Sequence, residues 1–182
     1  YRMFAKLCRE ALDRLDLHGV WMSGYEAICL GDRAQHEFFN GEITGPDDSN
    51  PNHWLTALRQ KRVLVVSPFK ITIEKQIPRL ADVWPGASWM EGIEFTIVMF
   101  PYLIDESCAE TWWEVYNRIG SIISQGDYDV ALFGCGGLGL PFAKLAKDAG
   151  RVGIHIGGHL QLLFGIYGKR HLQQPCLLYT SD

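Results

Sequence analysis

The chain has 182 residues, of which 47% are hydrophobic and 21% are charged, and its formal net charge is −4 at pH 7. This length and composition are typical of one globular domain with its own core, and the negative net charge excludes a general nucleic-acid binder, which needs a basic face. Five cysteines without a CxxC pair favour a reduced, cytoplasmic protein over a disulfide framework or a structural zinc site, and no apolar run reaches the about 18 residues of a membrane span.

The first 60 residues predict a lead-in of helix and loop. Apolar residues recur at helical spacing over residues 2–17 and predict an amphipathic helix. Residues 20–30 are compatible with either a strand or a helix, and Trp54 to Leu58 predict a short helix. Residues 41–52 have the composition of a polar loop, which fits a lid or a plain surface connection equally.

From residue 61 onward, short apolar strands alternate with amphipathic helices. The strands are predicted at 63–66, 95–100, 130–133 and 152–156. Pro78 should end or kink the first helix, and Ser107 and Glu110 are spaced as a capping box for the second. The alternation predicts an α/β, Rossmann-like domain with a mainly parallel sheet and helices on both faces.

The expected domain covers residues 1–175, with its Rossmann-like core at 61–175. Residues 176–182, CLLYTSD, resemble a translated transposase-type sequencing adapter on a metagenomic-type fragment. An ordinary apolar tail is the alternative. We therefore leave these seven residues out of the predicted fold.

A glycine-rich turn joins the predicted strand 130–133 to the helix that follows it. The glycines of its GxGxxG pattern are Gly134, Gly136, Gly137 and Gly139. Such glycines permit close backbone approach to a pyrophosphate at a helix N-terminus, or they only permit tight packing of the helix on the strand. A dinucleotide fold also needs an acidic residue at the end of the next strand, and the segment 152–156 is VGIHI.

Gly157 and Gly158 form a second glycine turn directly after the strand 152–156. The carboxyl ends of parallel strands meet at one edge of a sheet, so the two turns should form a floor for a phosphate-bearing ligand. His159 and Gln161 follow the second turn and are the candidate catalytic residues. His159 could donate a hydrogen bond to a phosphate or act as an acid–base group.

Further polar residues follow the carboxyl ends of predicted strands and are candidate nucleotide contacts. These residues are Ser67, Lys70, Lys169 and Arg170. The last two are placed to close over a diphosphate, or they are ordinary surface charges. Cys135 has no activating neighbour in the sequence and is more typical of a small packed residue than of a nucleophile. The six tryptophans follow core patterns, and the sequence does not identify a base or sugar platform among them.

Asp127, Tyr128 and Asp129 match the DxD pattern that holds a divalent metal and a nucleotide diphosphate in many glycosyltransferases. The pattern precedes the strand 130–133, so we expect it at the amino edge of the sheet, opposite the glycine turns. A solvated turn is the favoured interpretation.

The segment from Arg62 to Arg170 resembles the GT-D-type glycosyltransferase domain, long catalogued as a domain of unknown function in bacterial surface-polysaccharide and glycoprotein loci. The resemblance rests on VLVVSPF at 63–69 with Gln76, YDVALFGCGGLGLP at 128–141, IHIGGHLQLLFGI at 154–166 and GKR at 168–170. It implies a Rossmann-like domain that binds a nucleoside-diphosphate sugar and transfers the sugar to a glycan or glycoconjugate acceptor.

The resemblance implies a metal-dependent enzyme, because characterised members of this family bind a metal with a DxE motif. That motif follows the strand that corresponds to 152–156. Leu160 and Leu162 occupy the positions of the two acids, and no DxE string occurs in the chain. The resemblance thus names Mn²⁺ or Mg²⁺ as a cofactor without supplying metal ligands. His159, Gln161 and Lys169 or Arg170 are the residues left to take the place of the metal.

The resulting hypothesis is a glycosyltransferase-like protein of surface polysaccharide or glycoconjugate synthesis. Its expected partners are a nucleotide-sugar donor and a glycan acceptor, and the sequence indicates no oligomeric state. The alternatives are an NAD- or FAD-dependent Rossmann oxidoreductase and a non-catalytic nucleotide-binding or assembly module.

Overall fold

The computed structural model describes residues 2–20, 37–40, 53–86, 88–103 and 108–168. Its helices are α1 (Arg2–Leu12), α3 (Lys70–Gln76), α4 (Leu80–Val83), α5 (Trp112–Gln125), α6 (Gly139–Asp148) and α7 (Leu160–Leu163). Its strands are β1 (Leu17–Val20), β2 (Glu37–Asn40), β3 (Arg62–Ser67), β4 (Glu94–Met99), β5 (Val130–Phe133) and β6 (Val152–His155). Short 3₁₀ turns are η1 (Trp54–Leu58), η2 (Ile77–Arg79), η3 (Ser88–Met90), η4 (Gly136–Leu138) and η5 (Gly157–His159).

The main sheet of the described residues has the strand order β4–β3–β5–β6, and all its neighbouring strands are parallel. This confirms the predicted α/β, Rossmann-like fold with a mainly parallel sheet. A separate parallel pair of strands, β1 with β2, was not predicted. Because β4 lies on one side of β3 and β5 on the other, the chain reverses its direction across the sheet between these two central strands.

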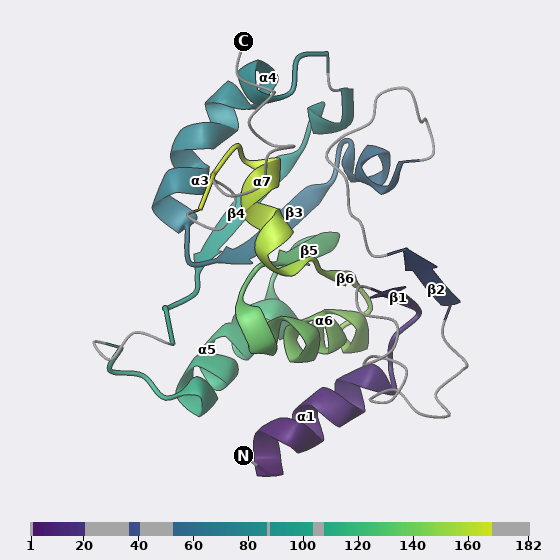
Figure 1. The fold of residues 1–182 in the computed structure, drawn as a ribbon, viewed down its shortest axis with the longest axis vertical. Coiled ribbons are helices and arrows are strands. Elements are labelled where there is room, and N and C mark those ends of the chain that lie inside the picture. The colour runs from purple at the N-terminus through teal and green to yellow at the C-terminus, as the bar shows by residue number, and fades with distance from the viewer. Residues whose placement is uncertain (1, 21–36, 41–52, 87, 104–107, 169–182) are drawn as a thin grey trace.

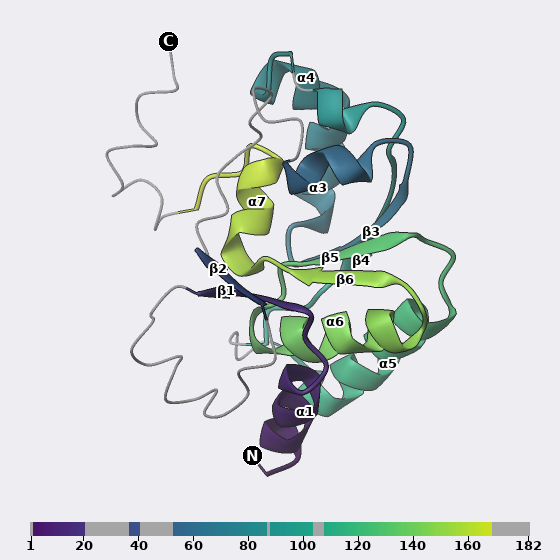
Figure 2. The ribbon, with the colours of Figure 1, turned by 90° about the vertical axis from the view of Figure 1, so that its right-hand side faces the viewer.

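Helices lie on both faces of the main sheet (Figures 1 and 2), and each face has its own hydrophobic core. Val63 and Val65 of β3 face a core formed with α3, α4 and α7, whereas Leu64 and Val66 face a core formed with α5 and α6. Parallel strands are joined by right-handed crossovers. The crossover from β3 to β4 runs opposite to the later ones, so its helices must cover the other face.

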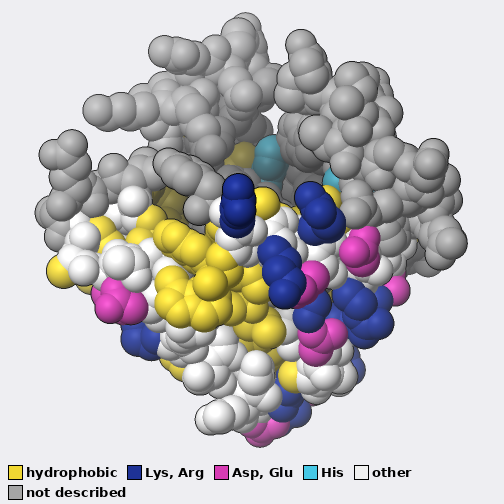
Figure 3. Space-filling view, turned by 90° about the horizontal axis from the view of Figure 1, so that it is seen from below, with side chains coloured by type: hydrophobic (Ala, Val, Ile, Leu, Met, Phe, Trp, Pro, Cys, Tyr) yellow, Lys and Arg dark blue, Asp and Glu magenta, His cyan; other side chains and the backbone are white. Residues whose placement is uncertain are grey.

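Helix α1 packs against α6, outside the sheet and on the same side as α5. Seen from below, apolar side chains form a surface patch bordered by Lys and Arg side chains, on the side of the molecule where α1 and α5 lie (Figure 3). Met3 and Trp113 are exposed apolar side chains of these two helices. No described helix is long and apolar enough to cross a membrane.

Two helix starts and ends differ from the sequence prediction. Helix α1 ends at Leu12 rather than at residue 17, which is instead the first residue of β1. The predicted capping box of Ser107 and Glu110 is wrong, since α5 begins at Trp112 and its N-cap is Thr111. The Thr111 hydroxyl accepts the N–H of Glu114 (3.3 Å), and the Glu114 carboxylate accepts the N–H of Thr111 (2.8 Å).

Several other predictions are confirmed. Helix α3 ends at Gln76 and α4 begins at Leu80, so the helical path is interrupted around Pro78. β5 has the predicted bounds, and the short helix at 54–58 is a 3₁₀ helix. The predicted loop at 41–52 and the tail at 176–182 lie outside the described residues.

Candidate functional site

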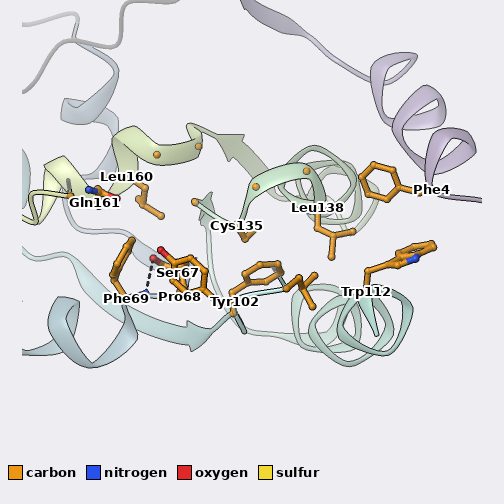
Figure 4. Close-up of a pocket in the computed structure, with 18 residues that line it drawn as sticks. Phe4, Ser67, Pro68, Phe69, Tyr102, Trp112, Cys135, Leu138, Leu160 and Gln161 are labelled. Carbon is orange, nitrogen blue, oxygen red and sulfur yellow. Dashed lines mark hydrogen bonds between the residues drawn. The ribbon is translucent and has the colours of Figure 1, made fainter. Parts of the chain in front are cut away.

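A cavity of about 640 Å³ opens at the carboxyl ends of the main sheet. Its walls come from the segments that follow β3, β4, β5 and β6, together with Phe4 of α1 and Trp112 of α5 (Figure 4). The chain reverses direction between β3 and β5, so the loops after these two strands diverge and leave a crevice. Open parallel sheets bind their ligands at this point, and the volume is in the range of small-molecule sites.

The cavity brings together most of the residues that the sequence predicted. Those that line it are Ser67, Gly134, Gly136, Gly137, Gly157, Gly158 and Gln161. Lys70, Gly139 and His159 are not among the lining residues; Lys70 pairs with Glu74 one turn along α3 (3.6 Å). Lys169 and Arg170 lie outside the described residues, directly after Gly168, which does line the cavity.

The glycines of the first turn have different roles. Gly136 has a φ of +59°, where a side chain is disfavoured, and a Cβ there would meet nothing within 4 Å. Gly134 is a packing residue, because a Cβ there would lie 2.7 Å from Leu160 Cδ2 and 3.0 Å from the carbonyl oxygen of Gly157. The two glycine turns therefore touch at Gly134, and Gly136 presents bare backbone to open space.

Gly139 is also a packing residue, and its neighbour is His155. A Cβ at Gly139 would lie 2.3 Å from His155 Cδ2, so the imidazole lies against the first residue of α6. His155 ends β6, the position at which a dinucleotide fold needs an acid. Desolvation by the surrounding protein lowers the pKa of His155, although the residue as a whole is exposed.

The helical segment 136–148 begins at the cavity wall. Helix geometry leaves its first N–H groups without acceptors inside the helix, and the helix dipole gives this end a partial positive charge. Gly136, Gly137 and Leu138 at this end all line the cavity. Gly157, with a φ of +55°, makes a similar turn beside it.

Two polar side chains are buried in the cavity wall. Ser67 is 1% exposed, and its Oγ accepts the N–H of Phe69 (3.2 Å), which leaves the hydroxyl able to donate. Gln161 is 4% exposed, and its Nε2 donates to the carbonyl oxygen of Ile166 (3.1 Å). Both side chains are therefore held in fixed positions.

Cys135 lies inside the first glycine turn and is 3% exposed. Burial raises its pKa to about 12, so the thiol is protonated at neutral pH. It packs in the core shared with α5 and α6. This confirms the interpretation of Cys135 as a packed residue rather than a nucleophile.

The DxD pattern forms a clamp on Arg62 at the amino edge of the sheet. The Asp129 carboxylate accepts the N–H of Arg62 (2.9 Å) and its guanidinium Nη2 (2.9 Å), and Asp127 pairs with the same guanidinium. Hydrogen bonds from Arg62 lower the pKa of Asp129 to about 2. Both acids are engaged at the edge opposite the cavity, as the sequence predicted for their location.

The residues of the second turn do not fit a divalent metal ion. Leu160 and Leu162 stand where the resembling family has acids, and Leu160 is 1% exposed within the core. Among the described residues, no group of His, Cys, Asp and Glu side chains is arranged to hold a metal. Divalent cations of this class require oxygen ligands, and a leucine side chain has none.

Five aromatic residues of the cavity wall were missed by sequence reasoning. They are Phe4, Phe69, Phe100, Tyr102 and Trp112. Phe69 follows the carboxyl end of β3, and this position in the sequence would have been enough to place it at the crevice. Phe4 lies far from the core in the sequence, and no local pattern places it beside a glycine turn.

Comparisons of the chain with protein-family models, curated proteins and solved structures found no match. The resemblance to the GT-D-type domain therefore stays a prediction. The chemistry of the site rests on the residues that line the cavity.

Proposed function

We propose that the protein binds a nucleoside-diphosphate sugar in this cavity and transfers the sugar to an acceptor glycan or glycoconjugate. The observation that carries the proposal is the meeting of two glycine turns in one cavity at the reversal point of the sheet. The N–H groups of the first turn attract the diphosphate. The open space at Gly136 lets a phosphate oxygen approach the backbone.

Sugar transfer moves negative charge onto the departing nucleoside diphosphate. N–H groups fixed in a helix turn stabilise such charge without reorganising, which lowers the barrier. Gln161 is held rigidly in the cavity wall, and we assign it to orienting the sugar. The acid–base role of His159 stays a prediction.

The described lining residues include no charged side chain. Lys169 and Arg170 follow Gly168 of the cavity wall, so we assign them the neutralisation of the diphosphate. Because the second turn carries leucines in place of acids, donor binding is proposed to need no divalent metal. Free thiols at Cys8, Cys108 and Cys135 are consistent with the proposed cytoplasmic location.

A thermal-shift screen tests the binding step. The panel is UDP, GDP, CDP, their hexose conjugates, NAD and NADP, each in EDTA and in Mn²⁺. Ligand at 100 times its Kd adds about 2.7 kcal/mol of stability, which raises the Tm of a domain of this size by roughly 5–10 °C. We expect a shift with one nucleoside-diphosphate family in both media.

Other outcomes would overturn the proposal in distinct ways. A shift with NAD or NADP alone would assign the cavity to an oxidoreductase. A shift that occurs without donor hydrolysis or sugar transfer to any acceptor would favour a non-catalytic binding module. No shift with any ligand, from a protein that melts cooperatively, would leave the glycine turns as architecture.

A matched pair of variants tests the proposed anion cradle of the first glycine turn. Gly136 and Gly150 both have positive φ, +59° and +75°, and a Cβ at either would meet nothing within 4 Å. Gly136→Val and Gly150→Val should therefore lose similar stability through backbone strain. Only Gly136→Val should weaken nucleoside-diphosphate binding, because Gly150 lies beyond the far end of α6.

A further inference from the structure

The cavity has two chemically different ends (Figure 4). Ser67 and Gln161 give one end a hydroxyl and an amide, with the ring of Phe69 beside them. Phe4 and Trp112 give the other end two aromatic rings. Cys135, inside the first glycine turn, lies between the two ends, so a ligand that spans the cavity passes over the cradle.

The aromatic end is built by three segments that are far apart in the sequence. The rings of Phe4 and Trp112 meet edge to face at 5.5 Å, and those of Trp112 and Trp113 do so at 5.5 Å. Phe4 in turn lies on the glycine turn, because a Cβ at Gly137 would be 3.0 Å from Phe4 Cζ. Trp112 is therefore held by contacts with two other rings. A ligand that stacks on it loses little free energy in ordering its side chain.

Trp112 is distinguished from the other tryptophans by its place in the structure. Among the tryptophans in the described part of the chain, it is the one that lines the cavity. Trp54, Trp84 and Trp89 pack on the core of the opposite sheet face. The Nε1 of Trp84 also donates to the carbonyl oxygen of Leu163 (3.0 Å).

We propose that Phe4 and Trp112 form the nucleobase subsite of the cavity. The donor then lies with its base on Trp112, its diphosphate over the glycine turns and its sugar toward Gln161. The order of groups in such a donor matches the order of surfaces in the cavity. A base offers a flat π face for stacking, and sugar hydroxyls require the hydrogen-bonding groups found at the other end. This inference rests on the proposed nucleotide-sugar binding.

Calorimetric titration of a matched pair of variants tests the subsite. Trp112→Leu removes the proposed platform, and Trp54→Leu removes a tryptophan that packs on the opposite sheet face and does not line the cavity. The ligands are UDP, GDP and CDP, with inorganic pyrophosphate as a probe that has no base. Loss of one base stack should weaken nucleoside-diphosphate binding roughly 10-fold.

The expected pattern separates the subsite from the cradle. Trp112→Leu should weaken binding of the nucleoside diphosphate and leave pyrophosphate binding unchanged, and Trp54→Leu should change neither. Gly136→Val should weaken both. If Trp112→Leu binds the nucleoside diphosphate as tightly as the parent protein, the subsite is wrong and the proposed function survives. If the folded parent protein binds no nucleoside diphosphate, both fall together.

A measurement on the unmodified protein covers the case in which Trp112→Leu does not fold. In saturation-transfer NMR, irradiation of the tryptophan indole N–H protons should reach the base protons of the bound nucleotide sugar more strongly than the protons of its hexose, because Trp112 is the described tryptophan that lines the cavity. Stronger transfer to the hexose would reverse the orientation and overturn the assignment of Phe4 and Trp112.

Discussion

The two ends of the parallel sheet are built on opposite principles. At the amino end, charged side chains have partners. Arg62 pairs with Asp127 and Asp129. The guanidinium of Arg151 lies 4.9 Å from the centre of the Tyr128 ring, and its Nε donates to the Tyr128 carbonyl oxygen. At the carboxyl end, the described cavity wall has no charged side chain, and the first residues of a helical segment line the cavity.

This difference shows which end can take a ligand. Charges that already have partners gain little from a further ion, whereas helix N–H groups without acceptors gain a hydrogen bond from any anion that reaches them. The DxD pattern looks like a metal site in the sequence and acts as an ion-pair clamp in the fold. The glycine turns carry no charge in the sequence, and in the fold they line the cavity in which we propose that an anion binds.

The largest expected effect is on packing at the carboxyl end. Gly134→Ala should cost about 3 kcal/mol, because its Cβ would collide with Leu160 and with the backbone of the second turn. Urea unfolding measures this loss. The double variant with Leu160→Ala should not recover it, since the carbonyl oxygen of Gly157 remains 3.0 Å away. The Cβ of Gly137→Ala would contact only the tip of the Phe4 ring. If Gly134→Ala lost less stability than Gly137→Ala, the contact between the two glycine turns would be contradicted.

The next effect is smaller because a side chain can yield. Gly139→Ala should cost about 1–2 kcal/mol by displacing the His155 ring from the start of α6. In a His155→Ala background the same change should be neutral or stabilising, because alanine is the better helix former. A double-mutant cycle by urea unfolding measures the coupling. Additive losses would show that His155 is not what Gly139 accommodates.

At the amino end the expected effect is smaller and depends on pH. The pKa of Asp129 is lowered to about 2 by Arg62, so its contribution to stability is complete above about pH 4, the ordinary aspartate pKa, and is lost as the pH falls toward 2. Asp129→Asn should therefore be less stable than the parent protein at pH 7, and the two should converge below pH 4. Unfolding curves at a series of pH values test this, and a difference that does not change with pH would contradict the clamp.

The smallest expected effect concerns Cys135, whose thiol should not react with an alkylating reagent. Because the thiol is buried and burial raises its pKa to about 12, iodoacetamide at pH 8 should leave Cys135 unmodified in the native protein. Cys108, which is only half-buried, serves as the internal control, and urea should expose both. Peptide mass spectrometry reads the result. Rapid native labelling of Cys135 would show that the first glycine turn opens.

The main sheet could be predicted because its signals are local. Apolar runs such as 130–133 set the strands, Pro78 divides a helix, and short alternating elements imply parallel pairing. The capping box was misplaced because Ser107 with Glu110 and Thr111 with Glu114 have the same spacing. Only the packing of α5 distinguishes between them. The pairing of β1 with β2 joins segments of no marked periodicity, and nothing local indicates it.

From residue 61 onward, the order of strands and helices along the chain, and the sheet edge where the glycine turns meet, could be derived from the sequence alone, since both follow from periodicity and from where each strand ends. Tertiary structure alone decided what each glycine does, because Gly134 and Gly136 differ in backbone conformation and in the atoms that a Cβ would meet. It also brought Phe4 of α1 beside Trp112 of α5. Contacts between distant segments depend on how helices pack on the sheet, and that information is spread over the whole chain.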